Sequence, residues 1–345
     1  MIDTQLEDLM QESVEHLEKN FYEKKFYYSY SSLNKLLWNP AVFYQMYIMG
    51  LKEEKTDAHL VQGKVIHALL LEEDRFDELF IVSPANLPTG NPRMVIDRVF
   101  YHHTELARNG DPREKLEDFQ DAILDIMKDM SYHQNLKTDQ QRLDKILTPD
   151  VFSYWAFMKM KNGKTLVDQE THDYCKTAVE LVRTNKDICR LIGSEITEFD
   201  NKEVFNELFL QHELEDKVFG VKGIIDNVVV DHDSKTIYIN DIKTTGKDLK
   251  DFPETVNVFS YWLQAAMYVS LGCMSFRELM EKNYEIKFHF VVIDRTFQTY
   301  AFPVSHATLN QWLDKFKETL DIASWHYTNK SFELPYQFTT GKMTL

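Results

Sequence analysis

Asp226, Asp241 and Lys243 stand in one short run of the chain, GVKGIIDNVVVDHDSKTIYINDIK, which covers residues 220–243. Asp226 interrupts an apolar stretch, and Asp241 and Lys243 end the next one. A carboxylate in such surroundings is costly to bury without a partner, because an unpaired charge in an apolar setting is strongly disfavoured. The run therefore predicts a site in which charged groups compensate one another.

The same run predicts two antiparallel strands joined by a tight turn. If the turn is centred between Asp233 and Ser234, Asp226 lies opposite Asp241. Directly opposed residues project to one face with Cβ atoms about 4.5–5.5 Å apart, and alternation places Lys243 on that face too. Two carboxylates so close require a cation, and hard oxygen ligands suit Mg²⁺ or Mn²⁺.

Several motifs in this order resemble those of the PD-(D/E)XK nuclease superfamily. Asp226 followed by Asp241-Ile242-Lys243 has the form of its D…(D/E)xK signature. Three further motifs resemble the RecB-like branch: the opening segment YSYSSLNKLLWNPAVFY (28–44), a GxxxH helix with Gly63 and His67, and a QxxxY helix with Gln264 and Tyr268. The resemblance is to phage and prophage exonucleases of the RecE type (exonuclease VIII). It covers about residues 28–80 and 165–300, whereas roughly 90–165 match no motif.

The resemblance implies a role for each of these residues. The implied metal ligands are His67, Asp226, Asp241 and the carbonyl of Ile242. Lys243 would orient or deprotonate the attacking water, and Gln264 and Tyr268 would position the scissile strand. Glu207, in VFNELFL, stands where relatives often carry an acidic residue and is an additional candidate. The expected DNA contacts are Ser31, Ser32, Lys35, Lys64 and Lys247, with Lys250 also near the site.

Each of these residues also has a structural interpretation. A single helix histidine such as His67 is more often a core residue than a ligand, and i,i+4 spacing gives Gln264 and Tyr268 a shared face without a function. Lys243 could instead be a solvated strand end, but its place two residues after Asp241 on the same face favours the catalytic role. Glu207 remains open between the two interpretations.

Composition limits the classes of protein to consider. The chain has 345 residues, 43% of them hydrophobic, and no apolar run approaches the ~18–20 residues of a membrane span. Its acidic N-terminus does not resemble a signal peptide. The three cysteines, Cys175, Cys189 and Cys273, are too widely spaced for a disulfide framework or a CxxC zinc site, so we expect a reducing cytoplasm. The resemblance implies that this is a bacterial or phage-infected host cytoplasm. Some relatives carry an iron–sulfur cysteine just before the opening-segment proline; here Asn39 precedes Pro40, and we expect no cluster.

The net charge of −16 opposes simple nucleic-acid binding, since phosphate contacts need Lys and Arg. Either metal ions and a local basic channel outweigh an acidic exterior, or the substrate is not DNA. We favour the first interpretation, because a metal-dependent nuclease needs carboxylates at its site.

The expected fold is α/β, with a mixed sheet flanked by helices as in restriction endonucleases. We expect an N-terminal helical extension at 1–27 and a nuclease domain at 28–345 with a mostly helical insertion at about 95–192. Helices are expected from Ser31 or Ser32 to Asn39 and at 57–73, 259–271 and 306–325, and a loop at 83–94. Strands are expected at 203–213, 218–230, 236–243, 286–294 and 297–303.

The motifs together predict a Mg²⁺- or Mn²⁺-dependent phosphodiesterase. The resemblance implies an exonuclease that digests linear double-stranded DNA in recombination or repair. It also implies a ring-shaped homo-oligomer that works with a single-strand annealing protein and does not bind a membrane. The alternatives are an endonuclease, a nuclease acting on RNA, single strands or flaps, and an inactive module that binds DNA ends.

Overall fold

The computed structural model describes residues 17, 19–51, 58–84, 86–161, 163–197 and 200–342. The chain divides into two compact units, one formed by residues 1–57 with 178–345 and the other by residues 58–177. Most of the expected N-terminal extension lies outside the described residues. None of the helices in the described part of the chain is long and apolar enough to cross a membrane.

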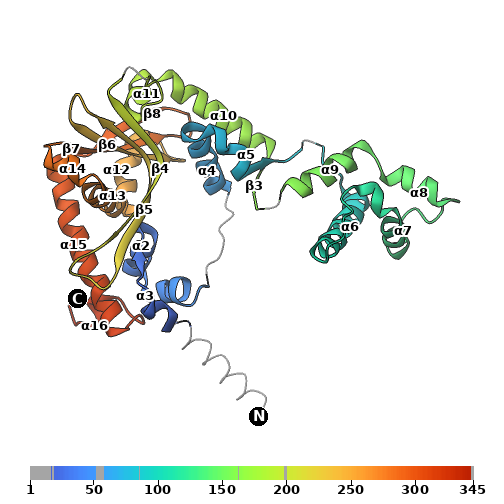
Figure 1. Ribbon diagram of the computed structural model, residues 1–345, viewed down its shortest axis with the longest axis horizontal. Coiled ribbons are helices and arrows are strands. Elements are labelled where there is room, and N and C mark those ends of the chain that lie inside the picture. The colour runs from blue at the N-terminus through green and yellow to red at the C-terminus, as the bar shows by residue number, and fades with distance from the viewer. Residues whose placement is uncertain are drawn as a thin grey trace, which may run out of the picture. The chain divides into compact units, whose positions relative to one another are not determined.

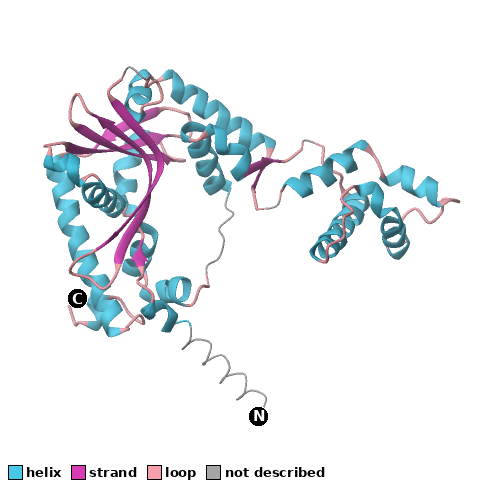
Figure 2. Ribbon diagram, in the orientation of Figure 1, coloured by secondary structure: helices cyan, strands magenta, loops and turns pink. Residues whose placement is uncertain are grey.

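A six-stranded mixed sheet forms the centre of the first unit (Figures 1 and 2). Its strands follow the order β1-β5-β6-β7-β8, and β4 pairs with β5. Their bounds are β1 Tyr27–Tyr28, β4 Lys202–Glu213, β5 Gly220–Asp231, β6 Thr236–Thr244, β7 Glu285–Ile293 and β8 Thr299–Pro303. The β1–β5 and β6–β7 pairs are parallel, and the β4–β5, β5–β6 and β7–β8 pairs are antiparallel. The mixed α/β fold expected from the sequence is confirmed.

The register of the central hairpin is the one that the sequence predicts. β5 pairs with β6 from Asp231↔Thr236 to Asn227↔Asn240, so the turn is centred between Asp233 and Ser234. β4 pairs with one edge of β5 from Gly220 to Asp231. At the opposite edge of β5, β1 pairs with its first residues and β6 pairs with its last residues.

Helices cover one face of the sheet around a large apolar core. The covering helices are α2 (Tyr30–Trp38), α3 (Pro40–Phe43), the π-helical turn Tyr44–Ile48, α12 (Phe252–Val258), α13 (Tyr261–Ser275) and α15 (His306–Asn329). α13 lies closest to the strands, because Gly223 of β5 leaves room for an aromatic ring: a Cβ at this position would lie 2.8 Å from Cε1 of Tyr268. The helix α11 (Lys186–Ile192) contacts β5 and β6 through their other face, where Asn227 and Asn240 donate to its last carbonyls. The short helices α14 (Arg277–Glu281) and α16 (Tyr336–Thr339) and the 3₁₀ turn Leu249–Asp251 complete this unit.

The second unit is mostly helical and has a core of its own. Its elements are α4 (Ala58–Leu71), a 3₁₀ turn (Glu73–Arg75), α5 (Phe76–Leu79), α6 (Gly90–Arg108), a second 3₁₀ turn (Leu116–Phe119), α7 (Gln120–Asp129), α8 (Asp139–Ile146), α9 (Pro149–Met160) and the first part of α10 (Gln169–Thr184). Two short parallel strands, β2 (Phe80–Val82) and β3 (Thr165–Val167), complete it. Ile96, Phe119, Ile123 and Trp155 are buried together where α6, α7 and α9 meet.

Most expected elements are present, and two expectations need correction. The cap of α2 is Ser29, not Ser31 or Ser32, because the chain leaves β1 in an extended conformation at Ser29, whose Oγ accepts from the N–H of Ser32. The expected loop at 83–94 ends early, since α6 begins at Gly90. Within the expected mostly helical insertion at about 95–192, α10 ends at Thr184, and Asn185 caps α11 with its side chain.

Candidate active site

Asp226 lies at the point where β6 stops pairing with β5 through its backbone. The last ladder pair is Asn227↔Asn240, and at the next position the carboxylate Oδ2 of Asp226 accepts the N–H of Ile242 at 2.7 Å. The Asp226 side chain is only 8% exposed. A buried carboxylate is stable here because it takes a backbone donor that would otherwise lose its partner.

Asp241 and Lys243 form an ion pair on β6, with Asp241 fully buried and the Lys243 side chain 15% exposed. The Nζ of Lys243 also lies 4.9 Å from the ring centroid of Tyr261, at the start of α13. Burial lowers the pKa of Lys243, but the Asp241 and Asp226 carboxylates outweigh it and raise the pKa above its ordinary value. Lys243 is therefore an ammonium inside the site, not a solvated strand end.

Glu207 has a left-handed backbone, with φ of 47°. The β4–β5 ladder is regular up to Asn206↔Asn227 and again from Leu208↔Ile225, so the irregular point falls at Glu207 and the facing Asp226. A positive φ is uncommon for a residue with a side chain and costs on the order of 1–3 kcal/mol. The distortion of β4 thus coincides with an acidic side chain at the centre of the candidate site.

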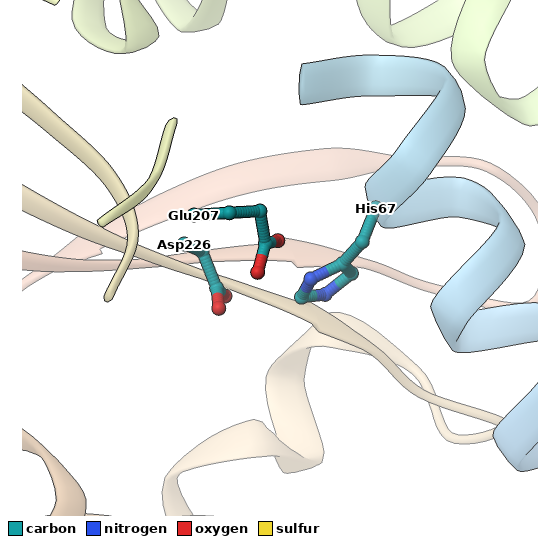
Figure 3. A group of neighbouring side chains, drawn as sticks. All are labelled: His67, Glu207 and Asp226. Carbon is teal, nitrogen blue, oxygen red and sulfur yellow. The ribbon is translucent and has the colours of Figure 1, made fainter. Parts of the chain in front are cut away.

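The carboxylates of Glu207 and Asp226 point toward the imidazole of His67, as Figure 3 shows. One ligand atom from each of these residues lies within 4.8 Å of the others. Carboxylate oxygens with an imidazole nitrogen make a donor set that fits a divalent cation such as Mg²⁺ or Mn²⁺. Asp241 is not a member of this group, and its expected role as a ligand stays a prediction.

Gln264 and Tyr268 of α13 share a buried face, and Nε2 of Gln264 donates to the hydroxyl of Tyr268 at 3.0 Å. Burial raises the pKa of Tyr268 well above its ordinary value, and the carboxylates of Asp241, Asp226 and Glu207 raise it further. The phenol of Tyr268 is therefore a neutral hydrogen-bonding group beside these three carboxylates.

The opening segment brings α2 next to the loop before α13. The hydroxyl of Tyr30 and the amide of Asn34 both donate to the carbonyl of Phe259. Burial, followed by the nearby Tyr261 and Asp241, raises the pKa of Tyr30. Of the two expected serines, Ser31 is exposed, whereas Ser32 is buried and its hydroxyl donates to the carbonyl of Ser29.

The expected basic residues differ in their surroundings. Lys35 is half-buried, with Nζ 4.7 Å from the ring centroid of Trp38. Lys64 and Lys247 are exposed, and Lys250 pairs at 3.8 Å with Asp248. Their expected contacts with DNA stay predictions.

Aromatic residues around Lys243 were not anticipated from the sequence. Tyr261 stacks on the half-exposed ring of Phe259, with centroids 5.6 Å apart, and also on Phe252 of α12. Ser260, which separates Phe259 from Tyr261 in the sequence, has a left-handed backbone with a φ of 56°. Their sequence, FSYW, is typical of residues in a hydrophobic core, so only the fold shows that they border the candidate site.

Comparison with known proteins bears on the family. A model of the PD-(D/E)XK nuclease superfamily matches residues 27–334. A crystal structure from Eubacterium rectale, of a protein provisionally described as an exonuclease, aligns with 92% of this chain and 89% of that one, at 11% sequence identity and a TM-score of 0.46. No curated protein matches the sequence.

Proposed function

Because this chain belongs to the PD-(D/E)XK nuclease superfamily, we propose that it is a metal-dependent exonuclease that degrades linear double-stranded DNA from its ends. The observation that carries the proposal is the meeting of Asp226, Asp241 and Lys243 at the end of the β5–β6 ladder. These residues have the form of the D…(D/E)xK signature, and they lie close together where the β5–β6 ladder ends.

The donor set for a metal is Asp226, Glu207 and His67, with Asp241 and the Ile242 carbonyl as further candidates. A divalent cation supplies positive charge that polarises the phosphodiester and activates water. The side chains of Asp226 and Glu207 would determine the position of the cation, because β4 and β5 hold these two residues side by side.

Lys243 acts on the substrate as an ammonium. Its ion pair with Asp241 holds the ammonium beside the carboxylates of the site. A fixed positive charge at this place stabilises the negative charge that develops on the phosphorane. Gln264 and Tyr268, which are hydrogen-bonded to each other, position the scissile strand beside this charge.

The side chains of Val258 and Phe259 are exposed next to the site, and we infer that they bind an unpaired base of the DNA. Phe259 is 51% exposed and one ring away from Lys243, through Tyr261. An aromatic ring of this kind stacks a base without sequence preference. With a net charge of −16, the protein then relies on this local contact, on metal and on a few lysines instead of long-range attraction.

A mixture of covalently closed circular DNA and its linearised form, in equal amounts, tests the proposal. With Mg²⁺ the linear form should be lost while the circle survives, and EDTA should prevent both losses. Equal loss of both forms would reject end-dependent action and favour an endonuclease. Loss of neither form, with DNA still bound, would indicate an inactive end-binding module, and faster loss of single strands would favour a single-strand or flap nuclease.

A further inference from the structure

Three asparagines form a chain of amide hydrogen bonds across the central strands. Nδ2 of Asn240 on β6 donates to Oδ1 of Asn227 on β5 at 2.7 Å, and Nδ2 of Asn227 donates to Oδ1 of Asn206 on β4 at 2.8 Å. The three residues face one another directly in the ladders. Asn227 and Asn240 are fully buried, and Asn206 is exposed. We refer to Asn206, Asn227 and Asn240 as the amide ladder.

The amide ladder is also anchored to α11. The second hydrogen of each buried amide goes to a carbonyl in the last turn of that helix, from Asn227 to Ile192 at 2.9 Å and from Asn240 to Leu191 at 3.1 Å. Since a carbonyl can only accept, each amide must turn its nitrogen toward the helix. The direction of every hydrogen bond in the ladder is thereby fixed.

Each member of the amide ladder is the sequence neighbour of an acidic residue of the candidate site. The pairs are Asn206-Glu207, Asp226-Asn227 and Asn240-Asp241. On β6, which is regular here, alternation turns Asn240 toward α11 and Asp241 toward the opposite face. On β4 and β5, Asn206 and Asn227 form the last regular pair before the irregular point at Glu207 and Asp226. The amide ladder thus fixes the backbone one residue away from each carboxylate.

This position matters because the β4–β5 ladder is irregular at Glu207 and Asp226. Where a ladder is broken, register is less strongly specified, and a one-residue slip would turn the side chains to the other face. The Asn227–Asn206 hydrogen bond lies directly before the break and the Asn240–Asn227 bond closes the β5–β6 ladder on the same side.

We propose that the amide ladder is a positioning device for Glu207, Asp226 and Asp241 that sets the affinity of the site for its divalent cation. This inference rests on the metal-dependent function proposed above. The asparagines touch neither metal nor substrate and act only through the strands. Residues that orient metal ligands from behind typically change metal affinity by about 10–100-fold when they are replaced.

Asn227→Leu tests the proposal, since it removes both donated bonds and the accepted bond at similar volume. The matched control is Val229→Ala, on the same face of the same strand, where Val229 packs near Gly193 after α11 and makes no amide hydrogen bond. Mn²⁺ binding is measured by calorimetry and by the metal-induced shift in Tm, and cleavage is measured across Mn²⁺ concentrations. Asn227→Leu should need about ten-fold more Mn²⁺ for half-saturation and regain most of its rate at saturation, whereas Val229→Ala should be destabilised with wild-type Mn²⁺ affinity.

Wild-type Mn²⁺ affinity in Asn227→Leu, or an equal loss of affinity in both variants, would overturn the positioning role. Should Asn227→Leu fail to fold, Asn206→Ala removes the acceptor of the Asn227 amide at the exposed end of the ladder, and the proposal requires a weaker loss of affinity in the same direction. Absence of Mn²⁺ binding by the wild-type protein would instead reject the proposed metal-dependent function itself, so the two failures are distinguishable.

Discussion

The backbone N–H of Ile242 donates to the carboxylate of Asp226, sixteen residues earlier in the chain. Through this bond a side chain takes the place of the next backbone rung between β5 and β6, and the strands can separate without leaving a buried donor unpaired. Asp226 therefore has a structural role and a proposed metal-binding role at once. The two roles can be separated by comparing stability with metal binding.

Asp226→Asn should abolish both cleavage and the rise in Tm that Mg²⁺ or Mn²⁺ produces, because the amide keeps an acceptor for Ile242 but loses the charge that attracts the cation. The matched control is Asp231→Asn on the same strand. Asp231 is equally buried, but it pairs with Lys202 and accepts from the turn after β5. A full metal-induced shift of Tm in Asp226→Asn would contradict the assignment of Asp226.

Lys243→Met should retain metal and DNA binding but lose cleavage, since the ammonium acts on charge that develops in the transition state. It should also lower the free energy of unfolding by about 3 kcal/mol, because it leaves the buried Asp241 without its cation. Adding Asp241→Asn should restore most of the stability and none of the activity. Near wild-type cleavage by Lys243→Met would reject the role. The control is Lys282→Met, at an exposed lysine that follows α14.

The register that brings Asp226 close to Asp241 and Lys243 could be predicted from the sequence because it depends only on local rules. The predicted direct pair of Asp226 with Asp241 is not part of the ladder, which ends one pair earlier, and Asp226 accepts the N–H of Ile242 instead. A tight turn fixes which residues face each other, and alternation fixes the face. The observed pairs from Asp231↔Thr236 to Asn227↔Asn240 follow directly from the predicted turn. The helices α4 and α13 were also predictable, since each carries a motif with residues four apart: Gly63 and His67 in α4, and Gln264 and Tyr268 in α13.

The amide ladder and the distortion at Glu207 could not be predicted in this way. An Asn within an apolar strand gives no sign of which residue it will meet, and Asn206, Asn227 and Asn240 are far apart in the chain before the strands pair. A positive φ at Glu207 follows from packing between β4 and β5 and has no local sequence signal, since the strand contains no glycine there. Ser29 was missed as a cap because three serines within four residues fit the same pattern.

Glu207→Gly should raise the stability of the metal-free protein by about 1 kcal/mol, because glycine adopts a positive φ without strain. The same change should weaken Mn²⁺ binding, since it removes a proposed ligand. Glu207→Gln is the control, because it keeps the strain and removes only the charge; it should weaken metal binding with no gain in stability. Thermal unfolding with and without Mn²⁺ measures both effects, and unchanged Mn²⁺ affinity in both variants would reject Glu207 as a ligand.

Phe259→Ala should raise the KM for linear duplex DNA several-fold with little effect on metal binding. Its ring is half-exposed and stacks on Tyr261, and the loss of one base-stacking contact costs about 1–3 kcal/mol. Phe259→Tyr preserves the ring and should behave as wild type. Steady-state cleavage of linear DNA at saturating Mg²⁺ measures the difference, and an unchanged KM in Phe259→Ala would show that the ring only packs against Tyr261.

His289 of β7 should make the protein less stable in mild acid. Burial, with a smaller effect from Lys287, lowers the pKa of His289 from 6.5 to about 4. Between these values the unfolded chain binds a proton that the folded chain does not, so this group's contribution is complete above pH 6.5 and falls as the pH drops toward 4. At pH 5 the loss is about 2 kcal/mol, or less because the ring is partly exposed.

His289→Gln removes this titration and should therefore reduce the fall in Tm between pH 7.5 and pH 5.0. The matched control is His102→Gln, which replaces an exposed histidine in the second unit and should leave the fall unchanged. The comparison is between the two pH values within each variant, so a general effect of the amide on packing beside Tyr238 cancels. An identical fall in Tm in wild type and His289→Gln would show that His289 does not titrate across unfolding in this range.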